Sequence, residues 1–123
     1  MMTKAFFLAE DEALIRMMLS DMIEELGHRV VAEASTIDKA MSLASTGAFE
    51  MAVLDINLNG ANIAPVAGIL LARKIPFLFA SGYGSGGIPA AFSARPMLRK
   101  PFQIAELDRA VRSLLSDGDQ AIA

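Results

Sequence analysis

Apolar residues occur along this chain in short, mostly unbroken runs, and the stretches between the runs repeat their apolar positions with a helical period. Five runs have the length of a strand: Ala5–Ala9, Arg29–Ala34, Met51–Leu54, Phe77–Ala80 and Met97–Arg99. Strands that are buried on both faces show continuous apolar runs instead of apolar–polar alternation. The pattern therefore predicts five strands, with 29–34 the weakest, in a sheet that is covered on both sides.

The stretches between these runs predict helices. In the first stretch the apolar positions fall on one helical face: Ile15, Met18, Leu19, Met22, Ile23 and Leu26. Gly27 follows them, and glycine commonly ends helices. Three more stretches have helical character: 36–47, which opens with N-cap residues, 65–75, which opens with a proline, and 104–115. Residues 57–60 indicate a loop, and only about one helical turn fits at 88–92.

Strands that alternate with helices form right-handed crossover units, which build a parallel sheet with helices on both faces. The chain has 123 residues and 54% apolar residues, enough for one well-packed core. It contains no internal repeat and no linker. We therefore predict an α/β protein with a single domain over 1–123, an ordered core at about 4–116 and a flexible tail at 117–123.

Composition excludes several classes of protein. There are no cysteines, so disulfides and thiolate metal sites are absent, and no apolar run is long enough to cross a membrane. The net charge is −3, and the basic pairs Arg73-Lys74 and Arg99-Lys100 are too short to form a nucleic-acid-binding face. We expect a cytoplasmic protein that binds neither nucleic acid nor membrane.

Polar side chains stand where the strongest predicted strands end. Glu10 and Asp11 follow the first strand, Asp55 the third, Ser81 the fourth and Lys100 the fifth. Ligands of open parallel sheets bind outside the carboxyl ends of the strands. We therefore expect three acids, a hydroxyl and a lysine to meet at one edge of the sheet.

This set of groups favours a hard cation and phosphoryl transfer. Three neighbouring carboxylates repel one another, which raises the pKa of at least one unless a cation neutralises them. Oxygen ligands without nearby His or Cys favour Mg²⁺ or Mn²⁺ over Zn²⁺. A lysine and a hydroxyl beside a metal-bound carboxylate are the groups that phosphoryl transfer to that carboxylate requires.

Four segments carry a resemblance to a known family: Leu8–Glu12, Val53–Asn57, Phe79–Tyr83 and Leu98–Phe102. In this order they resemble the four signatures of bacterial response-regulator receiver domains, and the resemblance covers essentially the whole chain. It implies a flavodoxin-like, doubly wound sheet of five parallel strands in the order 2-1-3-4-5. The segment Phe79–Gly84 with a shortened fourth helix is similar to a subgroup with a Phe-Ala-Thr-Gly motif, which often consists of stand-alone regulators.

The resemblance implies that Asp55 is the phosphoacceptor. The other implied site residues bind the metal ion or the phosphoryl group: Asp11 binds Mg²⁺ directly, Glu10 through water and Asn57 by its backbone carbonyl, while Ser81 and Lys100 contact the phosphoryl oxygens. A cis Lys100-Pro101 bond is also implied. The phosphodonor would be a sensor histidine kinase or a histidine phosphotransferase, and the chain would be no enzyme beyond its own phosphorylation and dephosphorylation. We expect a monomer or weak dimer that contacts a downstream protein or serves as a phosphate shuttle or sink.

Two positions depart from the family pattern. Ser81 replaces the commoner threonine but keeps the hydroxyl. Met97 stands where receivers usually carry an aromatic switch residue. We therefore expect ordering of the glycine-rich stretch 82–89, rather than rotation of one ring, to report phosphorylation.

Three other functions fit these residues less well. A haloacid-dehalogenase-type phosphatase needs a second acid two residues after its nucleophile, where this chain has Asn57, and the chain leaves no room for a substrate cap. A receiver-like scaffold without turnover does not need the complete set of site residues. A flavin carrier needs a phosphate-binding loop after the first strand, where Glu10 and Asp11 stand.

Three further features have structural interpretations. We expect His28, after the helix-ending Gly27, to be an exposed turn residue. Arg73-Lys74 is expected to be a solvated helix end. The first helix cannot bury both Met17 and Met18, so they could contribute to a partner surface.

Overall fold

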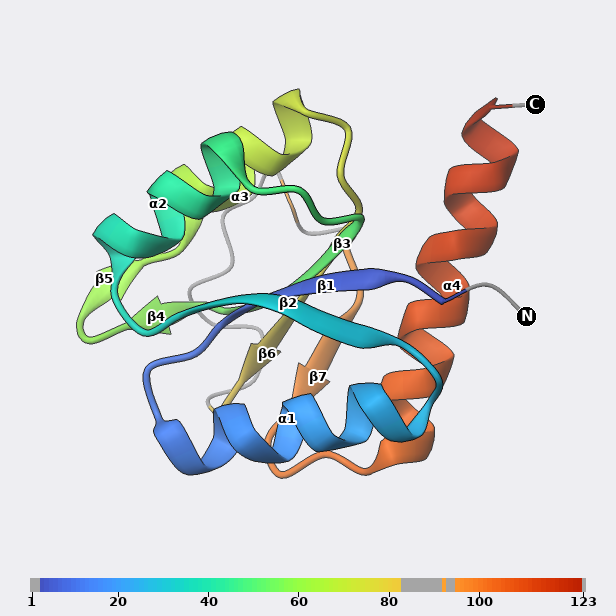
Figure 1. The fold of residues 1–123 in the computed structure, drawn as a ribbon, viewed down its shortest axis with the longest axis horizontal. Helices are drawn as coiled ribbons and strands as arrows, with labels where there is room; N and C mark the ends of the chain where they lie inside the picture. Colours follow the sequence, from blue (N-terminus) through green and yellow to red (C-terminus); the bar gives the residue numbers. More distant parts are fainter. Residues whose placement is uncertain (1–2, 83–91, 93–94, 123) are drawn as a thin grey trace.

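A parallel five-stranded sheet forms the centre of the molecule (Figure 1). The computed structural model describes residues 3–82, 92 and 95–122, with side chains described as far as residue 116. The strands are β1 (Ala5–Ala9), β2 (Arg29–Ala34), β3 (Met51–Asp55), β6 (Phe77–Ser81) and β7 (Met97–Arg99). Their spatial order is β2-β1-β3-β6-β7, which in terms of these five strands is the predicted 2-1-3-4-5. The predicted fold class is confirmed.

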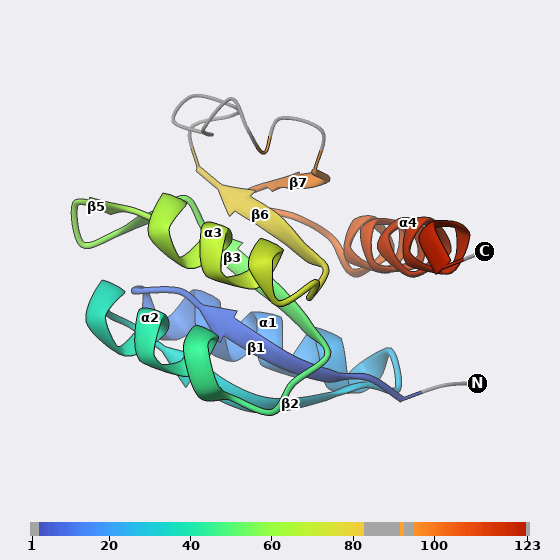
Figure 2. The same ribbon diagram turned by 90° about the horizontal axis from the view of Figure 1, so that it is seen from above.

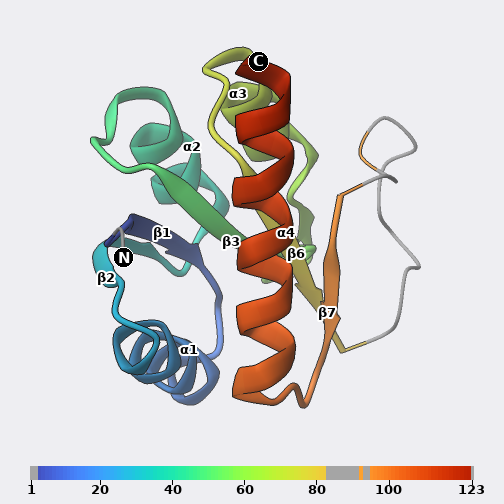
Figure 3. The ribbon, with the colours of Figure 1, turned by 90° about the vertical axis from the view of Figure 1, so that its right-hand side faces the viewer.

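In the described part of the chain, four helices cover the two faces of this sheet. The helices α1 (Ala13–Glu25) and α4 (Ile104–Ile122) pack on one face, and α2 (Ile37–Thr46) and α3 (Ala64–Ala72) pack on the other (Figures 1 and 2). Figure 3 shows α4 lying across the sheet with its carboxyl end far from β7. The layers therefore follow the three-layer arrangement that the alternation of strands and helices predicts.

The central strands supply both cores in alternation. Phe6 and Leu8 of β1 pack with α1 and α4, whereas Phe7 and Ala9 pack with α2 and α3. Successive side chains of a strand point to opposite faces, so a strand covered on both sides needs an apolar residue at every position. This requirement explains why β1, β3 and β6 are buried along their whole length.

Residues 57–62 form a hairpin where the pattern predicts a loop. The short strands β4 (Asn57–Leu58) and β5 (Ala61–Asn62) pair antiparallel. The two turn residues, Asn59 and Gly60, have φ angles of 51° and 90°. Left-handed φ at both central residues is what a tight type I′ turn requires, and Asn-Gly is its preferred sequence. The prediction of a loop was wrong because it ignored this dipeptide.

The helix boundaries follow capping chemistry where the sequence supplies it. Thr36 precedes α2, and its Oγ1 accepts a hydrogen bond of 3.3 Å from the backbone N–H of Lys39. Gly27, just past α1, adopts a φ of 92°. The helix α4 continues to Ile122 instead of ending before Asp117, so the chain does not leave the helix where the sequence suggests. That the segment 117–123 is flexible stays a prediction.

Two residues that were expected to be plainly solvated make specific contacts. Arg73 donates hydrogen bonds to the carbonyl oxygens of Ala44 and Gly47, over 2.6 and 3.0 Å, and so caps the end of α2. His28 is partly buried: its Nδ1 accepts a hydrogen bond of 3.0 Å from the Lys4 backbone, and its ring lies 5.4 Å from that of Phe6. The prediction of an exposed His28 was therefore wrong, whereas Arg73 and Lys74 are exposed as predicted, with Arg73 making these two contacts in addition.

The predicted short helix at 88–92 lies outside the described residues except for Phe92, which is buried against Phe77 and Phe79. In the part of the chain that the structure describes, no helix combines the length and apolar character needed to cross a membrane.

Candidate functional site

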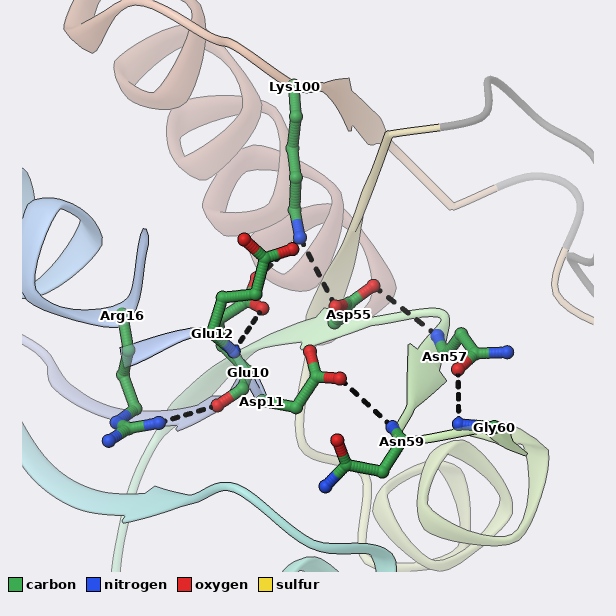
Figure 4. A network of polar contacts seen from close by, with 9 residues as sticks. All are labelled: Glu10, Asp11, Glu12, Arg16, Asp55, Asn57, Asn59, Gly60 and Lys100. Atoms are coloured by element: carbon green, nitrogen blue, oxygen red, sulfur yellow. Dashed lines mark hydrogen bonds and ion pairs between the residues drawn. The ribbon is translucent and has the colours of Figure 1, made fainter. Parts of the chain in front are cut away.

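The predicted site residues meet at the carboxyl edge of the sheet (Figure 4). Glu10 and Asp11 follow β1, Asp55 ends β3, Ser81 ends β6 and Lys100 follows β7. Because β1, β3, β6 and β7 are neighbours in parallel register, their ends lie at the same edge. The topology thus brings together groups that are separated by up to ninety residues in sequence.

Lys100 links the two buried acids. Its Nζ lies 2.6 Å from Glu10 Oε1 and 3.2 Å from Asp55 Oδ2, so one ammonium is shared between two carboxylates. Its backbone N–H donates to the Ser81 carbonyl oxygen over 2.8 Å, which fixes the start of this side chain beside β6. The Lys100-Pro101 bond is cis, as predicted.

The three acids offer a compact set of oxygen ligands. One carboxylate oxygen from each of Glu10, Asp11 and Asp55 lies within 4.8 Å of the others. Glu10 is only 1% exposed and Asp55 8%, whereas Asp11 is more open to solvent. Carboxylate oxygens without nitrogen or sulfur donors are the ligand set that suits Mg²⁺. The donor chemistry and the grouping therefore both fit a hard divalent cation.

The electrostatics separate the roles of the charged groups. Burial raises the pKa of Glu10 to about 7, although hydrogen bonds from Lys100 and the Glu12 backbone act against this rise. Repulsion from Asp55 contributes less than burial, so the expected effect of crowded acids is present but is not the main cause. Burial also works to lower the pKa of Lys100, but the contacts with Glu10 and Asp55 outweigh it and the pKa is raised. Lys100 therefore stays charged.

The hairpin contributes a contact that the sequence did not reveal. The backbone N–H of Asn59 donates to Asp11 Oδ2 over 3.0 Å, and the Asn59 side chain donates to the Ser35 carbonyl oxygen over 3.3 Å. Burial tends to raise the pKa of Asp11, but hydrogen bonds, that of Asn59 foremost, outweigh it and lower the pKa. The Asn-Gly turn therefore holds Asp11 as an ionised carboxylate, and the Asn-Gly dipeptide was the available signal.

Asn57 lies beside the Asp55 carboxylate. Its backbone N–H donates to Asp55 Oδ1 over 3.3 Å, and its side-chain Oδ1 accepts a hydrogen bond of 2.7 Å from Gly60 N–H. The side chain is thus engaged within the hairpin, which leaves the backbone of residue 57 as the part that faces Asp55.

Arg16 is a second residue that the sequence did not single out. Its Nη1 donates to the Glu10 carbonyl oxygen over 2.8 Å (Figure 4). Its Nε lies 3.3 Å from Glu33 Oε1. No motif links Arg16 to Glu33, because the pair depends on α1 packing beside β2.

A doubly wound parallel sheet with clustered acids and a lysine at its carboxyl edge defines a flavodoxin-like receiver fold. The family model of the response regulator receiver domain matches residues 6–112. The chain therefore belongs to the response regulator receiver domain family.

Individual relatives agree with this assignment. The chain is 30% identical over 113 residues to the transcriptional regulatory protein PdtaR of Mycobacterium tuberculosis, a match that covers 89% of this chain and 55% of PdtaR. The solution structure of SdrG from Sphingomonas melonis is 38% identical with a TM-score of 0.83, covering 92% of this chain and 97% of SdrG. A BeF3-activated conformation of SdrG, also 38% identical, gives a TM-score of 0.76 and covers 90% of this chain and 95% of that one. The response regulator PhyR from Brucella abortus is 28% identical with a TM-score of 0.83, covering 98% of this chain and 51% of PhyR.

The chain thus spans about half the length of PdtaR and PhyR but nearly all of SdrG. Receiver domains are signalling domains that bind Mg²⁺ at an acidic site and receive phosphate from kinases.

Proposed function

We propose that this chain accepts a phosphoryl group on Asp55 from a histidine kinase or histidine phosphotransferase and passes the signal on through protein contacts. The observation that carries the proposal is the sharing of the Lys100 ammonium between Asp55 and Glu10, within a cluster of three acids. A carboxylate that is nearly buried and paired with a lysine at an open sheet edge is suited to nucleophilic attack on a phosphoryl group.

The residues supply distinct parts of this reaction. A carboxylate oxygen of Asp55 attacks the phosphorus; a phosphorus–oxygen bond forms while the phosphorus–nitrogen bond of a phosphohistidine breaks, and the imidazole leaves with the electron pair. Lys100 neutralises charge on the phosphoryl oxygens, and the Ser81 hydroxyl donates to one of them. Bound Mg²⁺ would neutralise the other charges, held by Asp11 directly, by Glu10 through water, by Asp55 and by the Asn57 carbonyl.

An exposed apolar patch beside the site favours a protein as the phosphodonor. On α1, Leu14 is 70% exposed, Met17 62% and Met18 45%. Ile15 and Met18 also line a groove with Pro101 and Phe102, next to Lys100. Large exposed apolar patches mark interaction surfaces. This supports the expectation that Met17 and Met18 contribute to a partner surface.

The remaining expectations belong to the same proposal. The chain acts in the cytoplasm as a monomer or weak dimer, catalyses only its own phosphorylation and dephosphorylation, and binds no nucleic acid or membrane. Mn²⁺ can replace Mg²⁺, because both are hard cations that accept oxygen ligands.

The test uses acetyl phosphate as a small-molecule donor, with intact-mass spectrometry as the readout. We expect one phosphoryl increment on the wild type in the presence of Mg²⁺, and none after chelation or in Asp55→Asn. Asp21→Asn, which removes an exposed acid of α1, is the matched control and should be labelled like the wild type. Equal labelling of Asp55→Asn would show that Asp55 is not the acceptor.

A further inference from the structure

Arg16 is a charged residue near the site that the proposed phosphoryl chemistry does not use. Its guanidinium contacts neither Asp55 nor Lys100 among the described contacts; instead it donates to the backbone of Glu10 over 2.8 Å. The side chain is partly buried, at 23% exposure, and it reaches back from the first turns of α1 toward the end of β1. A guanidinium that binds one peptide carbonyl of an acidic loop can fix the orientation of that loop.

The peptide groups of Glu10 are held from two sides. The backbone N–H of Glu10 donates to the Ala34 carbonyl oxygen over 3.0 Å, and the Glu10 carbonyl oxygen accepts from Arg16. The first contact only continues the β1–β2 pairing. The contact with Arg16 acts on the peptide that joins Glu10 to Asp11. It therefore also affects the direction in which the chain leaves β1.

The position of that peptide decides where both acids point. Asp11 is attached to its nitrogen, and the Glu10 side chain precedes its carbonyl. With the peptide in its observed orientation, Glu10 Oε2 accepts a hydrogen bond of 3.0 Å from the Glu12 N–H. Asp11 Oδ2 accepts a hydrogen bond of 3.0 Å from the Asn59 N–H. An uncompensated change in ψ of Glu10 or φ of Asp11 would turn the chain that carries Asp11 relative to Asp55 and disturb the grouping of ligand oxygens.

Glu33 in turn orients Arg16. The Arg16 Nε lies 3.3 Å from Glu33 Oε1, so two different nitrogens of one planar group serve two acceptors. Lysine lacks this fixed fork of donors and cannot reproduce both contacts with the same geometry. The pairing with Glu33 also neutralises the guanidinium charge, so that Arg16 orients the acidic loop without competing strongly with a cation for it.

We propose that Arg16 is a positioning residue for the metal site, which acts through the Glu10–Asp11 peptide to hold both acids in the arrangement that binds the divalent cation. This inference rests on the proposed function of the same site. Groups that orient metal ligands without touching the metal commonly change metal affinity by about 10–100-fold when they are removed. A residue that only ties α1 to β2 would change stability and leave affinity unchanged.

The test is calorimetric titration of the full chain with Mg²⁺, alongside thermal unfolding of each variant. We expect Arg16→Gln to bind Mg²⁺ about tenfold more weakly than the wild type. Because Arg16 does not touch Asp55, labelling by acetyl phosphate should regain the wild-type rate once Mg²⁺ is saturating. Arg112→Gln is the matched control, since it breaks an Arg–Asp pair of 3.0 Å on the exposed side of α4, and its affinity should be unchanged.

Arg16→Lys keeps the charge and the aliphatic stem, and it carries the test where Arg16→Gln does not fold. It should also bind Mg²⁺ more weakly, because an ammonium cannot replace the fork. Wild-type affinity in a folded Arg16 variant, with or without a loss of thermal stability, would overturn the positioning role. A wild type that binds no Mg²⁺ at all would instead contradict the proposed function, and this inference with it.

Discussion

Lys100 occupies the position of a cation within the acid cluster. Its Nζ lies 2.6 Å from Glu10 Oε1, and Glu10 is nearly free of solvent exposure. A buried carboxylate is costly unless it is paired, and this ion pair is the contact that the structure provides for Oε1. In the proposed reaction Lys100 turns to a phosphoryl group on Asp55, and the proposed divalent cation takes its place beside Glu10. The requirement for a divalent cation in the proposed reaction follows from this exchange of partners.

Single residues at the strand ends could be predicted, and residues that depend on packing could not. Asp55 and Lys100 stand directly after apolar runs, so the parallel topology alone places them together. Arg16 and Asn59 act through backbone carbonyl and N–H groups, and the sequence gives no sign of which distant backbone group a side chain will meet. The Asn-Gly dipeptide is the preferred sequence of a hairpin turn, but it does not indicate the contact with Asp11.

His28 makes folding stability depend on pH. Burial lowers the pKa of His28 below its ordinary value of 6.5, and the positive charges of Lys4 and Arg112 act in the same direction against the opposing charge of Asp108. The Nδ1 atom accepts a hydrogen bond from the Lys4 backbone, and it does so only while it carries no proton. The unfolded chain therefore binds more protons than the folded chain in this range, and stability rises with pH. The stability that the neutral His28 contributes is fully present above about pH 6.5. It is lost as the pH falls through the lower pKa of His28 in the folded chain.

Urea unfolding of the wild type and of His28→Gln, at a series of pH values from about 7.5 to about 5, measures this pH dependence of stability. The free energy of unfolding at each pH is obtained by linear extrapolation. Because acidic groups titrate in both proteins, the difference between the two curves isolates the histidine. We expect the wild type to lose stability relative to His28→Gln as the pH falls. Parallel curves would show that the imidazole is protonated equally in the folded and unfolded chains.

At the scale of elements, the apolar runs and caps were sufficient to place the strands of the large sheet. The strand β2 has the predicted bounds, 29–34, and β7 the predicted bounds, 97–99. The end of α4 was missed because polar residues from Asp117 onward look like a tail, although no proline interrupts the helix there. The role of Arg73 was missed because it caps a helix that lies next to its own only in the folded protein.

The junction between α2 and β3 is tightly packed around Gly47, which has an ordinary φ of −67°. A Cβ at this position would lie 2.6 Å from the Leu43 carbonyl oxygen and 2.6 Å from the Phe49 ring. Gly47→Ala should therefore destabilise the protein by about 1–3 kcal/mol through overpacking alone. Gly68→Ala is the control: a Cβ there meets nothing within 4 Å in α3, and alanine favours a helix over glycine by about 0.5–1 kcal/mol.

Thermal and urea unfolding of the two glycine variants should give changes of opposite sign. A Gly47→Ala protein as stable as the wild type would mean that Phe49 and the end of α2 shift without cost. In that case the Arg73 contacts with Ala44 and Gly47 would not hold this junction rigidly.

At the scale of the whole molecule, the proposed signal from a phosphoryl group on Asp55 has to reach a surface that a partner can contact. Met97 is partly buried and packs against the core cluster that contains Phe79 and Phe92. A flexible, unbranched thioether lacks the rigid, ring-shaped body whose rotation could mark two discrete states. A readout through one aromatic side chain at this position is therefore unavailable to this chain.

We predict that the stretch 82–89, which follows Ser81 in the sequence, carries the signal from the site. Four of the nine glycines fall between Gly82 and Gly87, and each adds backbone freedom that must be lost when the chain orders. Ser81 is buried at the end of β6, so a movement of its hydroxyl toward a phosphoryl oxygen acts directly on Gly82. Contacts with phosphate commonly order such segments.

Hydrogen exchange with and without beryllofluoride, the group present in the activated conformation of SdrG, tests this connection. We expect slower exchange across 82–92 in the bound form, with Asp55→Asn as the control that shows no change. Unchanged exchange across 82–92 while the wild type binds beryllofluoride would exclude the switch, and the chain would then serve as a phosphate shuttle or sink.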